Sequence, residues 1–211
     1  STSETSMRQP SKWTMQSQTQ ILLKMLHDNG ITTCIDSGVA FPTVIGTRLK
    51  HRMLDRTQIS PHDSYDQRGA AAILLETDSG KPLLFYGSHL NHLDRPVGRR
   101  KAEAQTIIEH IHGQQHVGAV VVAADFNEQR PQHYSDHERD LINDSKKRRN
   151  STTLQDLVGH TFEKEGFVCS FDAKGAKHNW EQPEADSRPP MTHWTGTAID
   201  YSYGRGTVCV C

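Results

Sequence analysis

The chain has 211 residues, of which 34% are apolar, and its 24 Lys and Arg nearly balance 25 Asp and Glu at a formal net charge of -1. This length permits one domain with a lean core and long polar loops. A net charge so close to zero excludes a global attraction to nucleic acid or to an anionic membrane, so any site for a polyanion is local.

The sequence shows no targeting or membrane segment. No apolar run approaches the roughly 20 residues that cross a bilayer, and the first residues lack the charged-then-apolar layout of a signal peptide. The four cysteines lack the CxxC spacing of a metal site, so we interpret them as free thiols. These features favour a soluble, intracellular protein. Because the last residues, GTVCVC, alternate like a strand without a turn after them, we also expect the chain to be part of a longer one.

The N-terminal part is predicted to contain a polar segment and a helix. Residues 1–13 form the polar segment, and residues 14–211 form the domain. A helix is expected over residues 14–30, because four apolar residues share one helical face and Gly30 stands where a C-terminal cap belongs. These four are Ile21, Leu22, Met25 and Leu26.

Strands and a second helix follow. Residues 31–36 and 41–49 are predicted to be short strands, and residues 70–90 a β-hairpin, because two apolar runs flank the turn sequence Asp78-Ser79-Gly80. Residues 99–111 place apolar side chains at helical spacing, at Ala104, Ile107, Ile108 and Ile111. The apolar strand 119–125 comes next and ends in an acid.

The C-terminal third is more polar. Residues 128–150 contain little apolar material and are predicted to be a long surface loop. A short helix is expected over residues 153–160, and strands over residues 167–171 and 198–203.

Several predicted strands end in, or carry, polar residues that could converge. His89 ends one strand of the hairpin, Asp125 ends the next strand with Asn127 two residues later, and Asp200 stands in the last strand. Side chains at strand ends are held rigidly by the sheet. A carboxylate, an amide and a histidine are the groups that phosphoryl transfer requires, to bind metal or deprotonate water, to hold the nucleophile and to neutralise phosphate charge.

Four ordered motifs carry a family resemblance. RGAAAILLE, LLFYGSHLNH, VVVAADFN and TGTAIDYSY fall within about residues 40–203. Together they resemble the endonuclease/exonuclease/phosphatase superfamily, the deoxyribonuclease I-like, metal-dependent phosphodiesterases. The resemblance implies a four-layer α/β sandwich, in which two face-to-face β-sheets are flanked by helices, and a cleft that binds Mg²⁺ or Mn²⁺.

The resemblance also implies roles for individual residues. Asp125 would be the metal ligand and the group that activates water, Asn127 would position nucleophile and phosphate, and His89 would contact the scissile phosphate. A strand period of two would put Asp125 and Asn127 on one side, with Phe126 in the core. Asp200 would orient a histidine of a later Ser-Asp-His motif. For Arg68, two readings remain open, a phosphate contact or the beginning of a strand.

The chain departs from the family pattern at two places. The early metal-binding Glu has no counterpart, because no Glu lies between Glu4 and Glu76, and none of the eleven residues after Asp200 is His. We therefore expect an incomplete domain, in which Asp63 or Asp66 could replace the missing ligand. A Ser-Asp-His sequence does occur at residues 135–137, but it is out of family order.

Two functions follow from this pattern. The first is a metal-dependent hydrolase of phosphate esters, of phosphodiesterase, nuclease or phosphatase type. The alternative is a catalytically incomplete fragment or a non-catalytic binding module of the same fold. A nucleic-acid substrate is among the candidates, because the basic run 146–149 could grip a phosphate backbone, although such runs are more often solvated loop charge. The claims of His92, His193 and Trp194 to a site role are weaker.

Overall fold

The computed structural model describes residues 15–39, 42–60, 66–93, 97–115, 117–149, 151–172 and 199–206. The helical elements are α1 (Met15–Asp28), α2 (Arg99–His112), the short 3-10 helix η1 (Pro131–His133), α3 (Asp136–Arg148) and α4 (Leu157–Lys164). The strands are β1 (Thr33–Asp36), β2 (Val44–Thr47), β3 (His51–Gln58), β4 (Gly69–Leu75), β5 (Leu83–His89), β6 (Ala119–Asp125), β7 (Val168–Cys169) and β8 (Asp200–Gly206). None of the helices in these ranges has the length and apolarity that crossing a bilayer requires.

The main sheet has six strands in the order β3-β4-β5-β6-β8-β7. The predicted hairpin is confirmed as the antiparallel pair β4–β5, whose turn is closed by the bond from the Gly80 N–H to the Thr77 carbonyl. Strand β6 runs parallel to β5, and α2 makes the crossover between them, as such a pair requires. Strand β8 pairs antiparallel with both β6 and the short edge strand β7.

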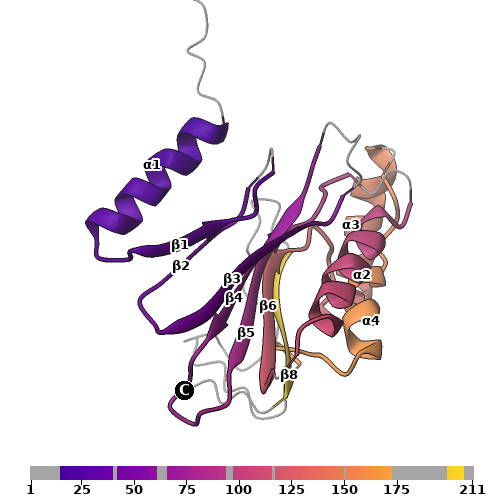
Figure 1. The fold of residues 1–211 in the computed structure, drawn as a ribbon. Coiled ribbons are helices and arrows are strands. Elements are labelled where there is room, and N and C mark those ends of the chain that lie inside the picture. Colours follow the sequence, from indigo (N-terminus) through magenta and orange to yellow (C-terminus); the bar gives the residue numbers. More distant parts are fainter. Residues whose placement is uncertain are drawn as a thin grey trace, which may run out of the picture.

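The elements are arranged in layers, as the four-layer prediction requires (Figure 1). Helices α2 and α4 cover one face of the main sheet, and the two-stranded sheet β1–β2 lies on the other face, with α1 beyond it (Figure 1). The larger core lies under the helices and includes the predicted α2 face. The smaller core joins β2 to the β4–β5 hairpin and is built from Ile45, Ala71, Ile73 and Leu75.

The side chains of β6 alternate between the two faces of the main sheet. Val120, Val122 and Ala124 are buried against the helices, whereas the residues between them point to the opposite face and are partly exposed. Asp125 belongs to this second set and is the last residue of the strand. The apolar pattern of the strand therefore fixes the face on which the carboxylate stands.

Two glycines allow the second sheet to approach the main one closely. A Cβ atom at Gly69 would lie 2.9 Å from the Ser37 carbonyl oxygen, and one at Gly87 would lie 3.0 Å from Ile45. Both distances are shorter than ordinary van der Waals contact, so larger residues at these positions would push the sheets apart. The Gly69 contact lies directly beside the strand end that carries His89.

The predicted N-terminal helix is confirmed as α1, and Gly30 ends it in the left-handed conformation with φ 75°. Its expected apolar face is not buried, however. Ile21, Leu22 and Met25 are all exposed, because α1 contacts the rest of the described chain mainly through β1.

Three elements differ from the sequence-based expectation. Residues 128–150 are not a loop throughout, since α3 occupies residues 136–148 and begins with a capping box between Ser135 and Glu138. Strand β3 was not predicted, because its sequence HRMLDRTQ is mostly polar, as befits a strand at the edge of the sheet. The short helix is also shifted, from residues 153–160 to residues 157–164.

Candidate functional site

Three of the predicted residues form a row across the end of the main sheet. In the strand register His89 on β5 is the partner of Asp125 on β6, and Asp125 is the partner of Asp200 on β8. Direct partners on neighbouring strands present their side chains on the same face. We call His89, Asp125 and Asp200 the edge row. Residues separated by up to 111 positions in the sequence are thus placed side by side by β-sheet pairing alone.

The His89 and Asp125 side chains face each other within the edge row. The His89 Nε2 atom lies 3.5 Å from the Asp125 Oδ2 atom, and both side chains are partly exposed. Burial lowers the pKa of His89 below its ordinary value and the Arg68 cation lowers it further, while the carboxylates of Asp125, Asp200 and Asp66 raise it in part. The His89 imidazole is therefore mainly neutral near pH 7 and has an N–H available to donate.

Asn127 joins the edge row through a turn. The Asn127 backbone N–H donates to the Asp125 Oδ1 atom at 2.8 Å, and its side-chain Nδ2 donates to the Leu90 carbonyl oxygen at 3.0 Å. Asn127 has φ 51°, so the strand period of two does not extend to it, and that part of the sequence interpretation is wrong. Phe126 does lie in the core as expected, 1% exposed.

The left-handed backbone of Asn127 leads to a prediction. Asn127→Gly should keep the fold, because glycine adopts a positive φ readily, but it should lower any turnover because the amide is lost. Asn127→Ala should be less stable than Asn127→Gly by about 1 kcal/mol, the usual cost of this conformation for a residue with a Cβ atom. Thermal unfolding of the two variants compares them. Equal stability would mean that position 127 does not hold a positive φ in solution.

Arg68 is buried beside the edge row and does not face solvent. Its side chain is 3% exposed, and its Nε and Nη2 atoms both lie 3.0 Å from the Asp66 Oδ1 atom. The sequence left two interpretations of Arg68 open, a phosphate contact or the beginning of a strand. The structure places Arg68 immediately before β4. Its guanidinium thus contributes a fixed positive charge near His89.

The carboxylates of the edge row fit a weakly held Mg²⁺ ion. They are Asp125 and its cross-strand partner Asp200, and carboxylate oxygens are the ligands that Mg²⁺ prefers. Within the described ranges no group of three or more His, Cys, Asp or Glu is placed to hold a metal. The donor set therefore suits an ion that takes one or two carboxylates and completes its shell with water and phosphate oxygens, which is common for Mg²⁺.

The other residues considered from the sequence lie elsewhere. Both Asp66 oxygens accept bonds from neighbouring side chains, and Asp66 belongs to no described group of three or more metal-ligand side chains. Ser135 and Asp136 belong to the beginning of α3, where Ser135 caps the helix and Asp136 pairs with Arg139. The positions 63, 193 and 194 fall outside the described residues.

The basic run belongs to the last turn of α3 and the residue after it. Lys147 pairs with Asp144 and Arg149 donates to Ser145, both within the same helix segment, and Lys147, Arg148 and Arg149 are exposed. Cations at a helix C-terminus also interact favourably with the helix dipole. These contacts agree with the interpretation of the run as solvated charge.

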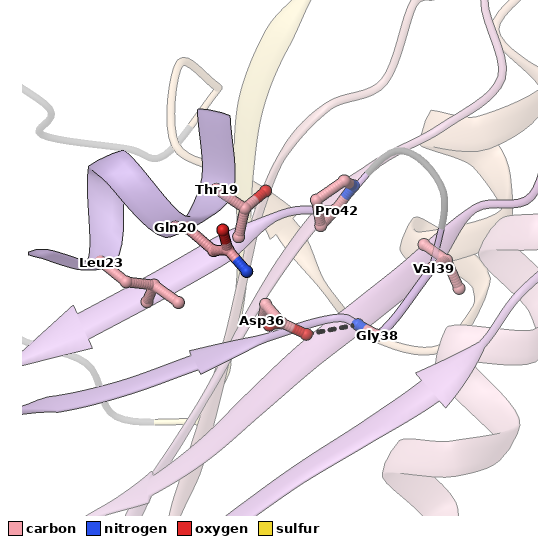
Figure 2. Close-up of a pocket in the computed structure, with 7 residues that line it drawn as sticks. All are labelled: Thr19, Gln20, Leu23, Asp36, Gly38, Val39 and Pro42. Carbon is pink, nitrogen blue, oxygen red and sulfur yellow. Dashed lines mark hydrogen bonds between the residues drawn. The ribbon is translucent and has the colours of Figure 1, made fainter. Parts of the chain in front are cut away.

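A hollow of about 540 Å³ lies between α1 and the turn after β1 (Figure 2). Asp36 is the charged side chain among those drawn, and it accepts the Gly38 N–H at 2.7 Å and lies 3.5 Å from an Arg56 nitrogen (Figure 2). The other lining residues drawn carry no charge. The drawn lining thus offers no cation to bind a phosphate, in contrast to the surroundings of the edge row.

Sequence reasoning missed a buried polar network behind the edge row. Asn91 is fully buried, and its backbone N–H donates to the Glu103 Oε2 atom at 2.8 Å. The Arg99 Nε atom lies 3.3 Å from the Glu103 Oε1 atom, and Arg99 Nη2 donates to the Asp66 carbonyl oxygen at 3.1 Å. The sequence signal was the charged residue Glu103 beside the apolar residues of α2, since a carboxylate there needs buried partners.

Comparisons with known proteins agree with the fold. No protein-family model and no curated protein sequence matches the chain. Solved structures do match. An endonuclease/exonuclease/phosphatase family protein from Bacteroides thetaiotaomicron is 13% identical with a TM-score of 0.55, over 88% of this chain and 65% of its own. The human nocturnin catalytic domain with bound sulfate anion is 14% identical with a TM-score of 0.56, over 86% of this chain and 63% of its own.

A third match is the mannosyl-6-phosphatase of Bacteroides thetaiotaomicron VPI-5482, 12% identical with a TM-score of 0.51, over 90% of this chain and 77% of its own. The chain thus spans just under two thirds of the first two structures. At these identities the likeness concerns the fold. The deoxyribonuclease I-like fold of endonuclease/exonuclease/phosphatase proteins, which the four sequence motifs predict, is confirmed.

Proposed function

We propose that the edge row is the centre of a site that hydrolyses phosphate esters. The observation that carries this proposal is the pairing of His89, Asp125 and Asp200 in register at one end of the sheet. A neutral imidazole, two carboxylates and the amide of Asn127 meet there, and a buried guanidinium lies close by. These are the groups that phosphate-ester hydrolysis by attack of water requires.

Asp125 is the group that accepts a proton from the attacking water. It is partly exposed, and its Oδ1 atom is fixed by the Asn127 N–H while its Oδ2 atom faces His89. His89 donates a hydrogen bond to a phosphate oxygen and so stabilises the charge that develops on it. Asn127 positions the phosphate and the water, because its turn holds it against the ends of both β5 and β6.

Mg²⁺ or Mn²⁺, when bound, would neutralise phosphate charge, and Asp125 with Asp200 beside it would hold the ion. The names of two similar solved structures support a phosphate ester as the substrate class. One is a mannosyl-6-phosphatase, and the other is an endonuclease/exonuclease/phosphatase family protein. We include nucleic acids and other phosphodiesters among the proposed substrates. The shared chemistry is a phosphoryl centre approached by water.

A second candidate is a phosphate-binding module without turnover. The observation that favours it is that no group of three or more metal-ligand side chains is assembled within the part of the chain that the structure describes. A site of this kind would bind a phosphate through His89 and Asn127 and leave the ester intact. Binding and turnover therefore have to be measured separately.

The test is hydrolysis of bis(p-nitrophenyl) phosphate and p-nitrophenyl phosphate with Mg²⁺, with Mn²⁺ and with EDTA, together with binding of inorganic phosphate by ³¹P NMR. We expect metal-dependent turnover that His89→Gln lowers by about 10²-fold, the usual effect of removing one donor to a developing charge. His137→Gln is the matched control, because this histidine is exposed in the first turn of α3 and should not change the rate.

Each outcome of this experiment decides between the candidates. Phosphate binding that His89→Gln weakens, without turnover in the wild type, would support the binding module. Neither turnover nor phosphate binding would contradict both candidates. A rate that His137→Gln lowers as much as His89→Gln would move the site to α3.

A further inference from the structure

We propose that Asp66 is a positioning residue of this site, which clamps the Arg68 guanidinium in place behind His89 and ties that clamp to the turn after β5. This inference rests on the proposed function and deepens it. Asp66 itself would touch neither substrate nor reacting atoms. It would act through Arg68, by holding a buried positive charge at a fixed position beside the phosphate.

The contact between Asp66 and Arg68 has the geometry of a clamp. Two nitrogens of the guanidinium, Nε and Nη2, each lie 3.0 Å from the same Asp66 Oδ1 atom. The Arg68 side chain is 3% exposed, whereas the Asp66 side chain is 18% exposed. A charged pair with two nitrogen contacts and so little exposure is held far more firmly than a surface ion pair.

The second Asp66 oxygen is used to hold the turn after β5. Its Oδ2 atom accepts a hydrogen bond from the Asn91 side chain and lies 3.7 Å from the His92 Nδ1 atom. Asn91 is in turn bonded through its backbone to Glu103 on α2, and Arg99 bridges Glu103 and the Asp66 carbonyl oxygen. The contacts close into a ring that contains Asp66, Asn91, Glu103 and Arg99. This ring leaves Asp66 little freedom to move.

The strand register places this clamp at the end of the edge row. Ala70 is the partner of Ser88, so one step further along the same antiparallel pair sets Gly69 opposite His89. Arg68 comes immediately before Gly69 and therefore lies next to the strand end that carries the phosphate contact. The Gly69 backbone is also packed closely against Ser37, which prevents this corner of the sheet from shifting.

Charge balance defines what the clamp does for the site. Arg68 and the ring together contain two cations, Arg68 and Arg99, and two carboxylates, Asp66 and Glu103. Removing the Asp66 charge would leave the Arg68 cation less compensated, so a phosphate dianion would bind as tightly as before or more tightly. The cation would no longer be fixed, however, and misplacing a charge that stabilises the transition state lowers the rate. Affinity and turnover should therefore change in different directions.

The test is the Asp66→Asn variant. We expect kcat for bis(p-nitrophenyl) phosphate to fall by about tenfold, as for loss of one positioned group, while KM and the Kd for inorganic phosphate stay equal or fall. If Asp66 only stabilised the fold, Asp66→Asn would lower kcat and would also raise KM and Kd. Glu76→Gln is the matched control, because Glu76 also contacts an arginine, Arg52, but at the opposite end of β4 from Gly69, so it should leave both constants unchanged.

A double variant in which residues 66 and 91 exchange side chains separates the two contacts of Asp66, one with Arg68 and one with Asn91. Asp66→Asn combined with Asn91→Asp restores a carboxamide bonded to a carboxylate but leaves Arg68 facing an uncharged group. We expect the swap to recover thermal stability and to keep the low kcat. Full recovery of kcat would overturn the proposal, since Asp66 would then act only through Asn91. Wild-type kcat in Asp66→Asn alone would overturn it as well.

One readout is independent of turnover. Hydrogen exchange of the Arg68 Nε–H, measured by ¹⁵N NMR, should become at least about tenfold faster in Asp66→Asn and remain fast in the swap, because the accepting carboxylate is lost. If the wild type neither hydrolyses the ester nor binds phosphate, the proposed function fails and this exchange still tests the clamp. Unchanged protection in Asp66→Asn would show that Asp66 does not hold Arg68.

Discussion

Replacing Asp125 with asparagine should lower hydrolysis of bis(p-nitrophenyl) phosphate by about 10²- to 10⁴-fold, the range expected when a general base is removed. The variant keeps the shape of the side chain and an oxygen that can accept the Asn127 N–H, but it cannot take a proton from water. Because Asp125 is partly exposed at a strand end, thermal unfolding should shift by no more than a few degrees. Initial rates and circular dichroism on the same sample measure both quantities.

A surface carboxylate provides the comparison for this variant. Asp144→Asn makes the same chemical change on the exposed side of α3, where Asp144 pairs with Lys147, and should leave the rate unchanged. Wild-type turnover in Asp125→Asn would remove Asp125 from the reaction. A large drop in thermal stability would instead assign to Asp125 a structural role at the end of β6.

The elements with a strong local signal could be predicted from the sequence. The β4–β5 hairpin is marked by its Asp78-Ser79-Gly80 turn, and α2 by four apolar residues at helical spacing that the structure buries without exception. The strand β6 is a continuous apolar run, so its end at Asp125 was visible too. In each case the local pattern and the burial in the sheet favour the same structure.

Elements without an apolar pattern could not be predicted in this way. Strand β3 lies at an edge, so it needs few apolar residues, and α3 has no buried residue in the described part of the chain. The signal for α3 was its capping box, Ser135 with Glu138 three residues later, which outweighs polar composition as an indicator of a helix start.

The site shows the same division between local and distant information. His89, Asp125 and Asp200 could be proposed because each lies in or ends a predicted strand, and pairing of those strands brings them together. The clamp behind them could not, because Asp66 meets its partner Asn91 across 25 residues and its carbonyl oxygen meets Arg99 across 33. Such contacts depend on the packing of α2 against the sheet and leave no spacing in the sequence.

The largest loss of stability is expected at Arg130. Its side chain is 2% exposed, and it contacts the carboxylates of Asp156, Asp172 and Glu163, with Nε 3.0 Å from Asp156 Oδ2 and Nη1 2.6 Å from Asp172 Oδ2. Arg130→Met should lower the free energy of unfolding by about 3–5 kcal/mol, because it leaves the buried Asp156 carboxylate without its cation. Urea unfolding followed by circular dichroism measures the change.

Two further variants show where this loss arises. Arg148→Met makes the same substitution on the exposed end of α3 and should change stability by no more than about 0.5 kcal/mol. Adding Asp156→Asn to Arg130→Met removes the uncompensated charge, so part of the stability should return, even though one more native ion-pair partner is gone. If the double variant is less stable than Arg130→Met, the loss comes from packing of the guanidinium over the Tyr203 ring, 5.6 Å from its centroid, and not from the buried charge. Arg130 would then stabilise the sheet end as a large side chain whose charge contributes little.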